Sequence, residues 1–581
     1  MSPGPSEIYS QRHEQRSRLA SQLDLDHRRV AWYRLAAFFL LVGGLLAAPG
    51  LWLLLPGLAF LALLRHHAAL SARRETARRA AEFYHEGKLR LRGEWPGRGV
   101  TAAFVEAQHP YARDLDMFGS GSLYDWLCRA RTRTGQQRLA DWLSRPALPD
   151  QIARRQLAAR ELQPRLDLRE DLAALQSSRQ HLKGISPQDW AEKPLQLRSG
   201  GARLVAALLG LVGWLALAYW VLRFDPLPLG VVLIVQQGFL RLAGRDAGEV
   251  LQRTESIRGE CLTLAVYLRR LEQEKVDSEL LQELWKPLNT RPSRALARLE
   301  AVMDTLESRR NPLLAPFYVL SLASFQLAYE VENWRARHAR ELPLWLDSLA
   351  QIEAVLTFAS LAWENEDYGW PRLLPEGGGV RAVQLGHPLL GAECVRNDVD
   401  LSETRLWIVS GSNMSGKSSL LRALGCNVVL AMAGGPTRAQ EMALEPLRIA
   451  ASIQVSDSLM AGISRFYAEI LRLRQVLEEA GGPGRLLYLL DEILGGTNSQ
   501  DRLVGAQAVI RRLYELESLG LVTTHDLALT ELVDELGVGS ANVHFEDQLH
   551  EGVMSFDYHL RSGVVQRSNA LELMRAVGLQ V

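Results

Sequence analysis

At residues 411–418 the chain reads GSNMSGKS, from Gly411 to Ser418, which matches the pattern G-x-x-x-x-G-K-[ST]. An apolar, strand-like run precedes this stretch at residues 406–410, and a helix-forming run follows at 419–430. In this order of strand, glycine-rich loop and helix, backbone N–H groups and the helix N-terminus face a bound phosphate. The stretch therefore predicts a nucleotide-binding α/β domain.

A second apolar strand ends in two acidic residues about seventy positions later. Residues 486–490 lead directly into Asp491 and Glu492, as in the second half of a P-loop ATPase. A third strand is expected at 521–524 and is followed by His525. Strands that alternate with helices predict a mostly parallel sheet, whose carboxyl ends would bring these residues together.

These residues can be given roles in the binding and hydrolysis of ATP. We expect Lys417 to neutralise the β- and γ-phosphates, and Ser418 and Asp491 to hold Mg²⁺. Glu492 would polarise the attacking water, and His525 could contact the γ-phosphate, although a lone histidine is more often structural. The residues expected to contact the nucleotide in this loop are Gly411, Ser412, Asn413, Met414, Ser415, Gly416, Lys417, Ser418 and Ser419.

The charge and the cysteine content of the chain bear on nucleic-acid binding, on the cellular compartment and on zinc binding. Basic and acidic residues number 66 each, so the formal net charge is zero. This balance argues against binding to nucleic acid through bulk positive charge, while a local basic groove stays possible. The four cysteines lie far apart without a C-x-x-C pair, which favours a reducing compartment and predicts no zinc site.

Two apolar zones predict attachment to a membrane. Residues 35–64 carry no charge and are interrupted at Pro49, and a second zone, 204–240, is interrupted by the turn at 223–226. Each reads as a transmembrane hairpin flanked by arginines, with both ends on the cytoplasmic side. We therefore expect the inner membrane of a bacterium, with the nucleotide-binding domain facing the cytoplasm. The alternative is that both zones are buried helices of a large soluble core.

The chain divides into three parts on these grounds. Residues 1–80 form a polar helix and the first hairpin (35–64). Residues 81–370 have apolar residues at three- and four-residue spacing and predict an all-α core or lever domain that contains the second hairpin (204–240). A Pro/Gly-rich boundary follows, and residues 380–581 form the α/β domain.

Taken together, the motifs resemble those of the MutS mismatch-repair ATPases. The loop with an asparagine inside it is similar to their Walker A motif, and LDEILGGTNS (490–499) is similar to their Walker B motif and the turn after it. Further similar segments are TTHD (523–526), GHPL (386–389), GISRFYAE (462–469, which departs from the serine-containing signature at Arg465) and DLDMF (114–118). The resemblance covers roughly residues 105–200 and 250–581.

This resemblance implies a P-loop ATPase of the ABC-like class that works as a homodimer through its ATPase domains. Ser464 would reach the γ-phosphate of the partner's nucleotide, and Asn413 would lie near the same interface. Tyr558 corresponds to a position that stacks on adenine. A second stacking position, usually aromatic, is occupied here by Cys394.

The sequence leaves two classes of function open. The first 80 residues do not resemble the domain that reads mismatches, and Phe104-Val105-Glu106 is taken as a chance copy of its Phe-x-Glu wedge. The sequence reaches Leu579 where relatives continue into a helix-turn-helix, so pairing is expected to rest on the ATPase faces. One hypothesis is a membrane-tethered ATPase that moves helical levers around double-stranded DNA in repair or recombination. The other is the same motor acting on a membrane or protein partner.

Overall fold

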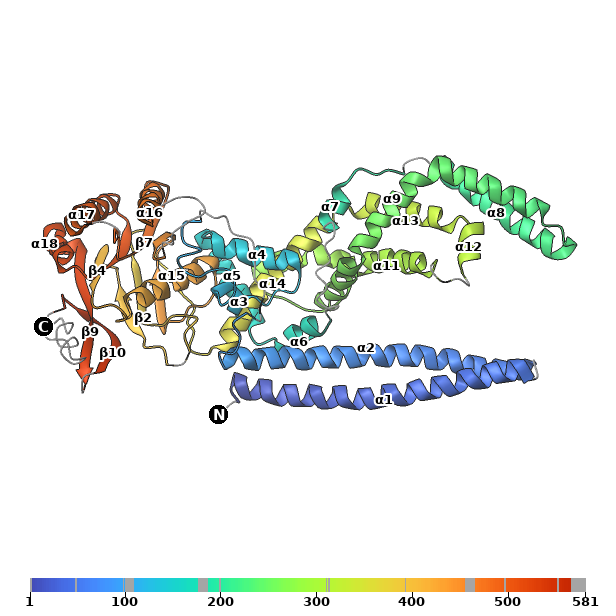
Figure 1. Ribbon diagram of the computed structural model, residues 1–581, viewed down its shortest axis with the longest axis horizontal. Helices are drawn as coiled ribbons and strands as arrows, with labels where there is room; N and C mark the ends of the chain where they lie inside the picture. The colour runs from blue at the N-terminus through green and yellow to red at the C-terminus, as the bar shows by residue number, and fades with distance from the viewer. Residues whose placement is uncertain are drawn as a thin grey trace.

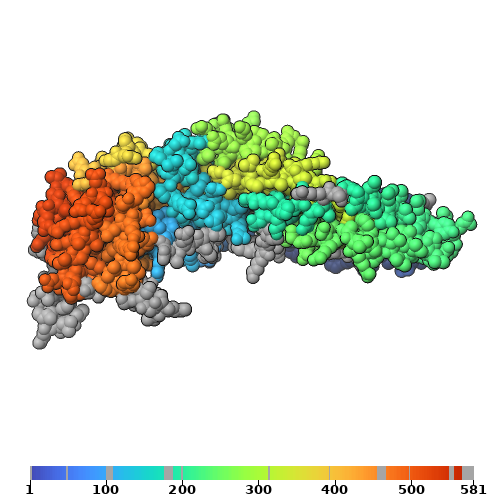
Figure 2. All heavy atoms as spheres, turned by 90° about the horizontal axis from the view of Figure 1, so that it is seen from above, coloured from blue at the N-terminus to red at the C-terminus, as the bar shows by residue number. Residues whose placement is uncertain are grey.

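The computed structural model describes residues 3–47, 50–97, 99, 109–175, 187–197, 200–309, 311, 314–391, 393–454, 465–495, 498–550 and 553–565. Figure 1 shows an elongated molecule, with the α/β domain at one end and a helical middle. Two helical hairpins reach toward the opposite end. The view from above shows the same long body, with the α/β domain and the second hairpin at its two ends (Figure 2).

The larger sheet of the α/β domain has six strands in the order β10-β9-β4-β8-β7-β6. Every neighbouring pair is parallel except β9 and β10, so the expected mostly parallel sheet is present. The strands are β4 (Leu406–Ser410), β6 (Leu447–Ser452), β7 (Arg485–Asp491), β8 (Leu519–Thr524), β9 (Ser540–His550) and β10 (Val553–Ser562). The central strands β4 and β8 are buried along their whole length, as apolar runs in a parallel sheet should be.

A smaller, four-stranded sheet was not anticipated from the sequence. Its order is β1-β5-β2-β3, and its strands are β1 (Arg372–Leu373), β2 (Val380–Leu385), β3 (Asn397–Asp400) and β5 (Glu441–Leu444). Strands of two to six residues give a weak periodic signal, which explains the omission. The helices of the domain are α15 (Lys417–Ala433), α16 (Arg465–Ala480), α17 (Ser499–Glu515) and α18 (Leu532–Leu536).

The first apolar zone forms the distal part of a long helical hairpin. Helix α1 (Pro5–Ala47) and helix α2 (Leu54–Leu91) run side by side (Figure 1) and are joined through the short 3-10 helix η1 (Leu51–Leu53). Apolar side chains near the tip face outward, with Leu46 81% and Leu55 79% exposed. The polar ends pack on the helical middle instead, through Tyr9, Phe83 and Tyr84.

The second apolar zone forms a hairpin as well. Helix α8 (Gly200–Arg223) is followed by helix α9 (Leu227–Leu271), which continues without a break from the apolar arm into the helical middle. Leu222 is 78% and Phe224 87% exposed at its tip. Figure 1 shows this tip at the same end of the molecule as the tip of the first hairpin.

Helix α14 (Leu342–Glu364) forms the centre of the helical middle. Around it and along the chain lie α3 (Leu123–Leu127), α4 (Arg133–Ser144), α5 (Pro149–Leu162), α6 (Leu166–Leu175), α7 (Pro187–Glu192), α10 (Glu279–Trp285), α11 (Pro292–Ser308), α12 (Ala315–Leu320) and α13 (Ala323–His338). Five described helices are long and apolar enough to cross a membrane, namely α1, α2, α8, α9 and α14. In α14 the apolar window is 83% buried, against at most 22% in the other four, so α14 is a core helix.

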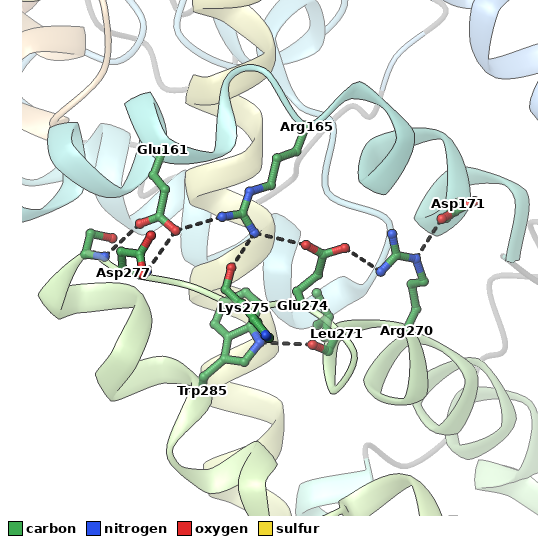
Figure 3. Close-up of polar contacts among 10 residues, drawn as sticks. Glu161, Arg165, Asp171, Arg270, Leu271, Glu274, Lys275, Asp277 and Trp285 are labelled. Atoms are coloured by element: carbon green, nitrogen blue, oxygen red, sulfur yellow. Dashed lines mark hydrogen bonds and ion pairs between the residues drawn. The ribbon is translucent and has the colours of Figure 1, made fainter.

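Ion pairs fix the C-terminal end of α9, the helix that continues from the second hairpin, to α6 and to the turn before it (Figure 3). Glu274, just after α9, contacts Arg165 at 2.9 Å and Arg270 at 2.6 Å. Arg270 also contacts Asp171 of α6 at 2.6 Å. A displacement of α9 would therefore move α6 and the turn that contains Arg165.

Candidate nucleotide-binding site

The glycine-rich loop joins β4 to α15 at the carboxyl edge of the larger sheet, as its sequence context predicts. Gly416 has a φ of +107°, in the region where a side chain is strained. A Cβ atom there would also lie 3.1 Å from Cδ1 of Tyr558. Because Gly416 is the N-cap and supplies no side-chain cap, the first N–H groups of α15 are left for an anion.

Lys417 and two serines line the interior of this loop. The ammonium group of Lys417 donates to the carbonyl oxygens of Gly411 and Ser412, at 2.8 Å each, and its side chain is only 4% exposed. The hydroxyl oxygens of Ser412 and Ser415 are buried without a hydrogen-bond partner among the described residues. Buried hydroxyls without partners are costly by themselves, and a bound phosphate would provide acceptors for them.

A hydroxyl and a carboxylate meet at the position expected for Mg²⁺. The Ser418 hydroxyl donates to Oδ2 of Asp491 at 2.6 Å. The second carboxylate oxygen of Asp491 accepts a hydrogen bond from the Thr523 hydroxyl. Asp491 and Thr523 are register partners on the parallel strands β7 and β8, so the sheet itself orients the carboxylate. Oxygen ligands of this kind fit Mg²⁺.

Glu492 lies between the loop lysine and the histidine. Its Oε1 is 3.3 Å from Nζ of Lys417, and its Oε2 is 3.5 Å from Nδ1 of His525. The backbone at Glu492 has a φ of +43°, and its N–H group donates to both oxygens of Thr523. A pocket beside Glu492 is lined by Arg502, Thr523, Thr524, His525 and Asp526, among others.

Comparison with known proteins gives the same assignment for this end of the chain. Residues 407–580 match MutS domain V. This part of the chain is therefore a domain of the MutS family. The chain is 32% identical over 294 residues to the endonuclease MutS2 of Thermus thermophilus, covering 48% of this chain and 38% of the relative. It is 31% identical over 317 residues to the DNA mismatch repair protein MutS of Sorangium cellulosum, covering 53% and 31%. The corresponding protein of Dinoroseobacter shibae is 32% identical over 253 residues, covering 42% and 28%. The chain thus spans less than two fifths of the length of each of these relatives.

Tyr558 lies over the loop of this MutS domain V, at a distortion in β10. Its ring is close to Gly416, as noted above, and the residue is 44% exposed. Its carbonyl oxygen accepts from the amide of Asn397 at 2.9 Å, and the same amide group accepts from the N–H of Leu560 at 2.7 Å. The register of β10 against β9 shifts between Phe556 and Leu560. Asn397 bonds the backbone groups of β10 at this irregularity, in place of a neighbouring strand. Cys394 is half-buried three residues before this clamp.

The other predicted residues are either exposed to solvent or lie outside the residues that the structure describes. Asn413, Met414 and Ser419 are exposed, with Met414 at 83%. Ser464 lies outside the described residues, as does Phe104-Val105-Glu106. The signature segment is described from Arg465 onward as the start of α16.

Several contacts at this site were not foreseen from the sequence. Thr523 and Asn397 are two examples, and Glu469 of α16 is a third, because its carboxylate accepts the N–H of Leu494 after β7. Thr523 belongs to the motif at 523–526, which by itself assigns it no role. The only available signal for it was its register opposite Asp491 on a neighbouring strand, which requires the strand order to be known.

A segment from before the helical middle docks against MutS domain V. Within residues 109–117, the carbonyl oxygen of Pro110 accepts from the N–H of Ala451 on β6 at 2.9 Å. Arg472 of α16 contacts the Asp114 carboxylate at 2.6 Å and the Pro110 carbonyl at 2.7 Å. Movement of α16 would therefore be transmitted to this segment.

Proposed function

We propose that this protein is a membrane-tethered ATPase of the MutS family, which binds and hydrolyses Mg²⁺-ATP at a site shared between two copies. The observation that carries the proposal is the convergence of Lys417, Ser418, Asp491, Glu492 and His525 at one edge of the sheet. These groups come from three different strand ends and share no local structural task that would explain their meeting.

Each side chain has a distinct role in this proposal. Lys417 and the N–H groups of α15 bind the phosphates, and Ser418 with Asp491 would hold Mg²⁺, which neutralises phosphate charge when bound. Glu492 orients and polarises water, because its carboxylate faces the open pocket that also contains His525. Tyr558, partly exposed above the loop, offers a ring face to the adenine.

Attachment to the inner membrane is supported by the two hairpins. Their apolar side chains are exposed at the tips, and both tips lie at the end opposite MutS domain V (Figure 1). Contiguous exposed apolar surface of this extent needs a partner. The flanking arginines Arg34, Arg65, Arg203 and Arg241 support a cytoplasmic position for the body of the protein.

The helical middle is suited to transmit motion between the nucleotide and the hairpins. At the end of α14, Oε1 of Glu364 accepts from Tyr9 at 2.9 Å and from Arg90 at 2.7 Å, so both helices of the first hairpin are held by one carboxylate. Glu364 is the last residue of α14, and the next element of the chain is β1, in the smaller sheet of the α/β domain. A change at the ATPase face would therefore reach the hairpin through rigid helices.

Two classes of partner are candidates for the target of the helical middle and the hairpins. The names of the relatives, which refer to mismatch repair and an endonuclease, favour double-stranded DNA. The second candidate is a membrane or protein partner, and it is favoured by the apolar hairpin tips at the far end of the lever.

Two measurements test the proposal. Detergent-purified protein should hydrolyse Mg²⁺-ATP, and an Asp491→Asn variant should lose Mg²⁺-dependent turnover. Binding to a DNA duplex should then be titrated between about 50 and 200 mM salt, where 6–10 phosphate contacts would weaken it about 10³- to 10⁵-fold. Absence of turnover would refute the ATPase, and absence of salt-sensitive DNA binding would select the second partner class.

A further inference from the structure

A third apolar segment lies beside the second hairpin. No charged residue occurs between Arg310 and Glu330. Within this run α12 exposes Phe317 at 53% and Val319 at 56%. α12 has only six residues and has Pro316 in its first turn, so it lacks the pattern of a long apolar helix.

The turn after α12 is packed closely against the apolar part of α8. A Cβ atom on Gly210 would lie 2.9 Å from the carbonyl oxygen of Ser321, and one on Gly213 would lie 3.1 Å from that of Leu320. Trp214 donates its indole N–H to the Ser321 hydroxyl at 3.1 Å, and its ring centroid is 5.3 Å from that of Phe317. The two glycines thus give the turn room to lie against α8.

Gln236 of α9 connects α8 to this turn from within the hairpin. Its amide nitrogen donates to the carbonyl oxygens of Leu209 and Leu320, at 3.0 Å each, and the residue is 2% exposed. The chain leaves helical geometry here, since Leu322 has a φ of +48°. Irregular backbone can lie at membrane depth only where the protein provides partners for its polar groups. Gln236 provides one for the Leu320 carbonyl at the C-terminal end of α12.

The depth of the contact follows from the helix geometry. Gly210 lies seven residues after the flanking Arg203, which is about 10 Å along the helix at 1.5 Å per residue. That distance is about a third of the ~30 Å hydrocarbon core. Figure 1 shows α12 beside the hairpin, at the same end of the molecule as both tips.

We propose that α12 and the following turn insert into the near leaflet beside α8, as a third membrane element that does not cross the bilayer, held by Gln236. The proposal rests on the membrane attachment proposed above. Its occupant is lipid acyl chain, because the exposed apolar face is continuous with that of the hairpin and the segment is uncharged. A six-residue helix is too short to span the membrane.

Fluorescence quenching in vesicles tests this placement. The full-length protein, with Cys394→Ser to remove its one partly exposed thiol, would be labelled with an environment-sensitive dye at Val319→Cys. Leu215→Cys on α8 is the reference inside the hairpin, and Leu157→Cys on α5 is the aqueous control. These three positions have matched exposures of 56%, 60% and 57%. Vesicles of phosphatidylcholine and phosphatidylglycerol would carry doxyl-labelled lipid, and iodide would be the aqueous quencher.

Val319 should be quenched by doxyl lipid at least twofold more than Leu157, and most strongly when the doxyl group is near the carbonyl end of the acyl chain. If Leu215 is quenched by lipid while Val319 responds only to iodide, or to neither quencher, the inference is wrong and α12 faces water or a protein. If Leu215 is not quenched by lipid either, membrane attachment itself fails.

The role of Gln236 has its own matched control in the adjacent, exposed Gln237. Gln236→Leu should reduce lipid quenching at Val319 toward the value for Leu157, because the Leu320 carbonyl loses its donor in an apolar medium. Gln237→Leu should leave it unchanged, and Leu215 should be unaffected by both. Unchanged quenching at Val319 in the Gln236→Leu variant would remove the holding role.

Discussion

The ammonium group of Lys417 lies 3.3 Å from the carboxylate of Glu492, so the loop lysine is in direct contact with a carboxylate that lines the pocket beside His525. A phosphate that binds in the loop would compete for the same lysine. Its arrival would release Glu492 toward His525, which is 3.5 Å away on the other side. The site thereby links phosphate binding to the availability of the carboxylate.

Replacing Glu492 by Gln should leave ATP binding intact and slow hydrolysis about 100-fold or more, because water loses its polarising carboxylate while Asp491 still contacts Ser418. Lys417→Ala should weaken binding itself. Equilibrium nucleotide binding and steady-state turnover distinguish the two effects. The exposed Glu531→Gln is the control, and wild-type turnover in Glu492→Gln would rule out its role as base.

Hydrolysis should require two copies, since Ser464 is expected to complete the partner's site. Turnover per chain should rise with protein concentration in detergent, and mixing Lys417→Ala with Ser464→Ala should restore one working site per mixed dimer. The full-length chain is the right material, because segment 109–117 forms part of the fold around α16. Constant turnover with no rescue on mixing would indicate a monomeric enzyme.

The carboxylate of Glu364 should be important for holding the first hairpin. Burial alone would raise the pKa of Glu364, but Arg129 and Arg90 outweigh it and hold the pKa far below its usual range. Glu364→Gln would leave both buried arginines without a counter-charge, at a cost of about 3–5 kcal/mol. Hydrogen exchange of the amides of α2 near Arg90 should accelerate accordingly. The exposed Glu366→Gln should leave this exchange at the wild-type rate.

Stability should fall in mild acid because of His387. Burial, and then Arg422 and Arg438, lower the pKa of His387 from 6.5 to about 4. Between these two pH values His387 is protonated in the unfolded chain but neutral in the folded chain. The stability that is present above pH 6.5 is therefore lost as the pH falls toward 4. Between pH 7 and pH 5 the loss amounts to about 2 kcal/mol.

Urea unfolding at both pH values would measure this loss, as the difference between wild type and His387→Gln. The free energy of unfolding of His387→Gln should fall by about 2 kcal/mol less between pH 7 and pH 5 than that of the wild type. The exposed His559→Gln should behave as the wild type does. An equal pH dependence in wild type and His387→Gln would contradict the assignment.

The sequence is informative where the chemistry is local. The strand, loop and helix around Lys417 are adjacent in the chain, and Asp491 and Glu492 directly follow an apolar strand, so pattern and spacing predict both. The two hairpins are predicted for the same reason, since an uncharged run and a Pro/Gly turn are local features.

Contacts between distant segments could not be predicted in this way. The clamp between Asn397 and Tyr558 spans 161 positions, and the contact between Asp114 and Arg472 spans 358. Neither has a periodic or compositional signature, because both depend on how two surfaces meet. The α12 segment was missed because Pro312 and Pro316 divide it, so that it resembles a loop.

The long polar part of α1 has a geometric consequence for assembly. Residues 5–34 extend for about 45 Å at 1.5 Å per residue, and the contacts at Glu364 fix this stalk to the body. On a shared bilayer, all copies would carry their P-loops at a common height. Two copies would then meet by lateral diffusion in the membrane, with their ATP sites at the same height above it. The surface density of the protein would set how often a composite site forms.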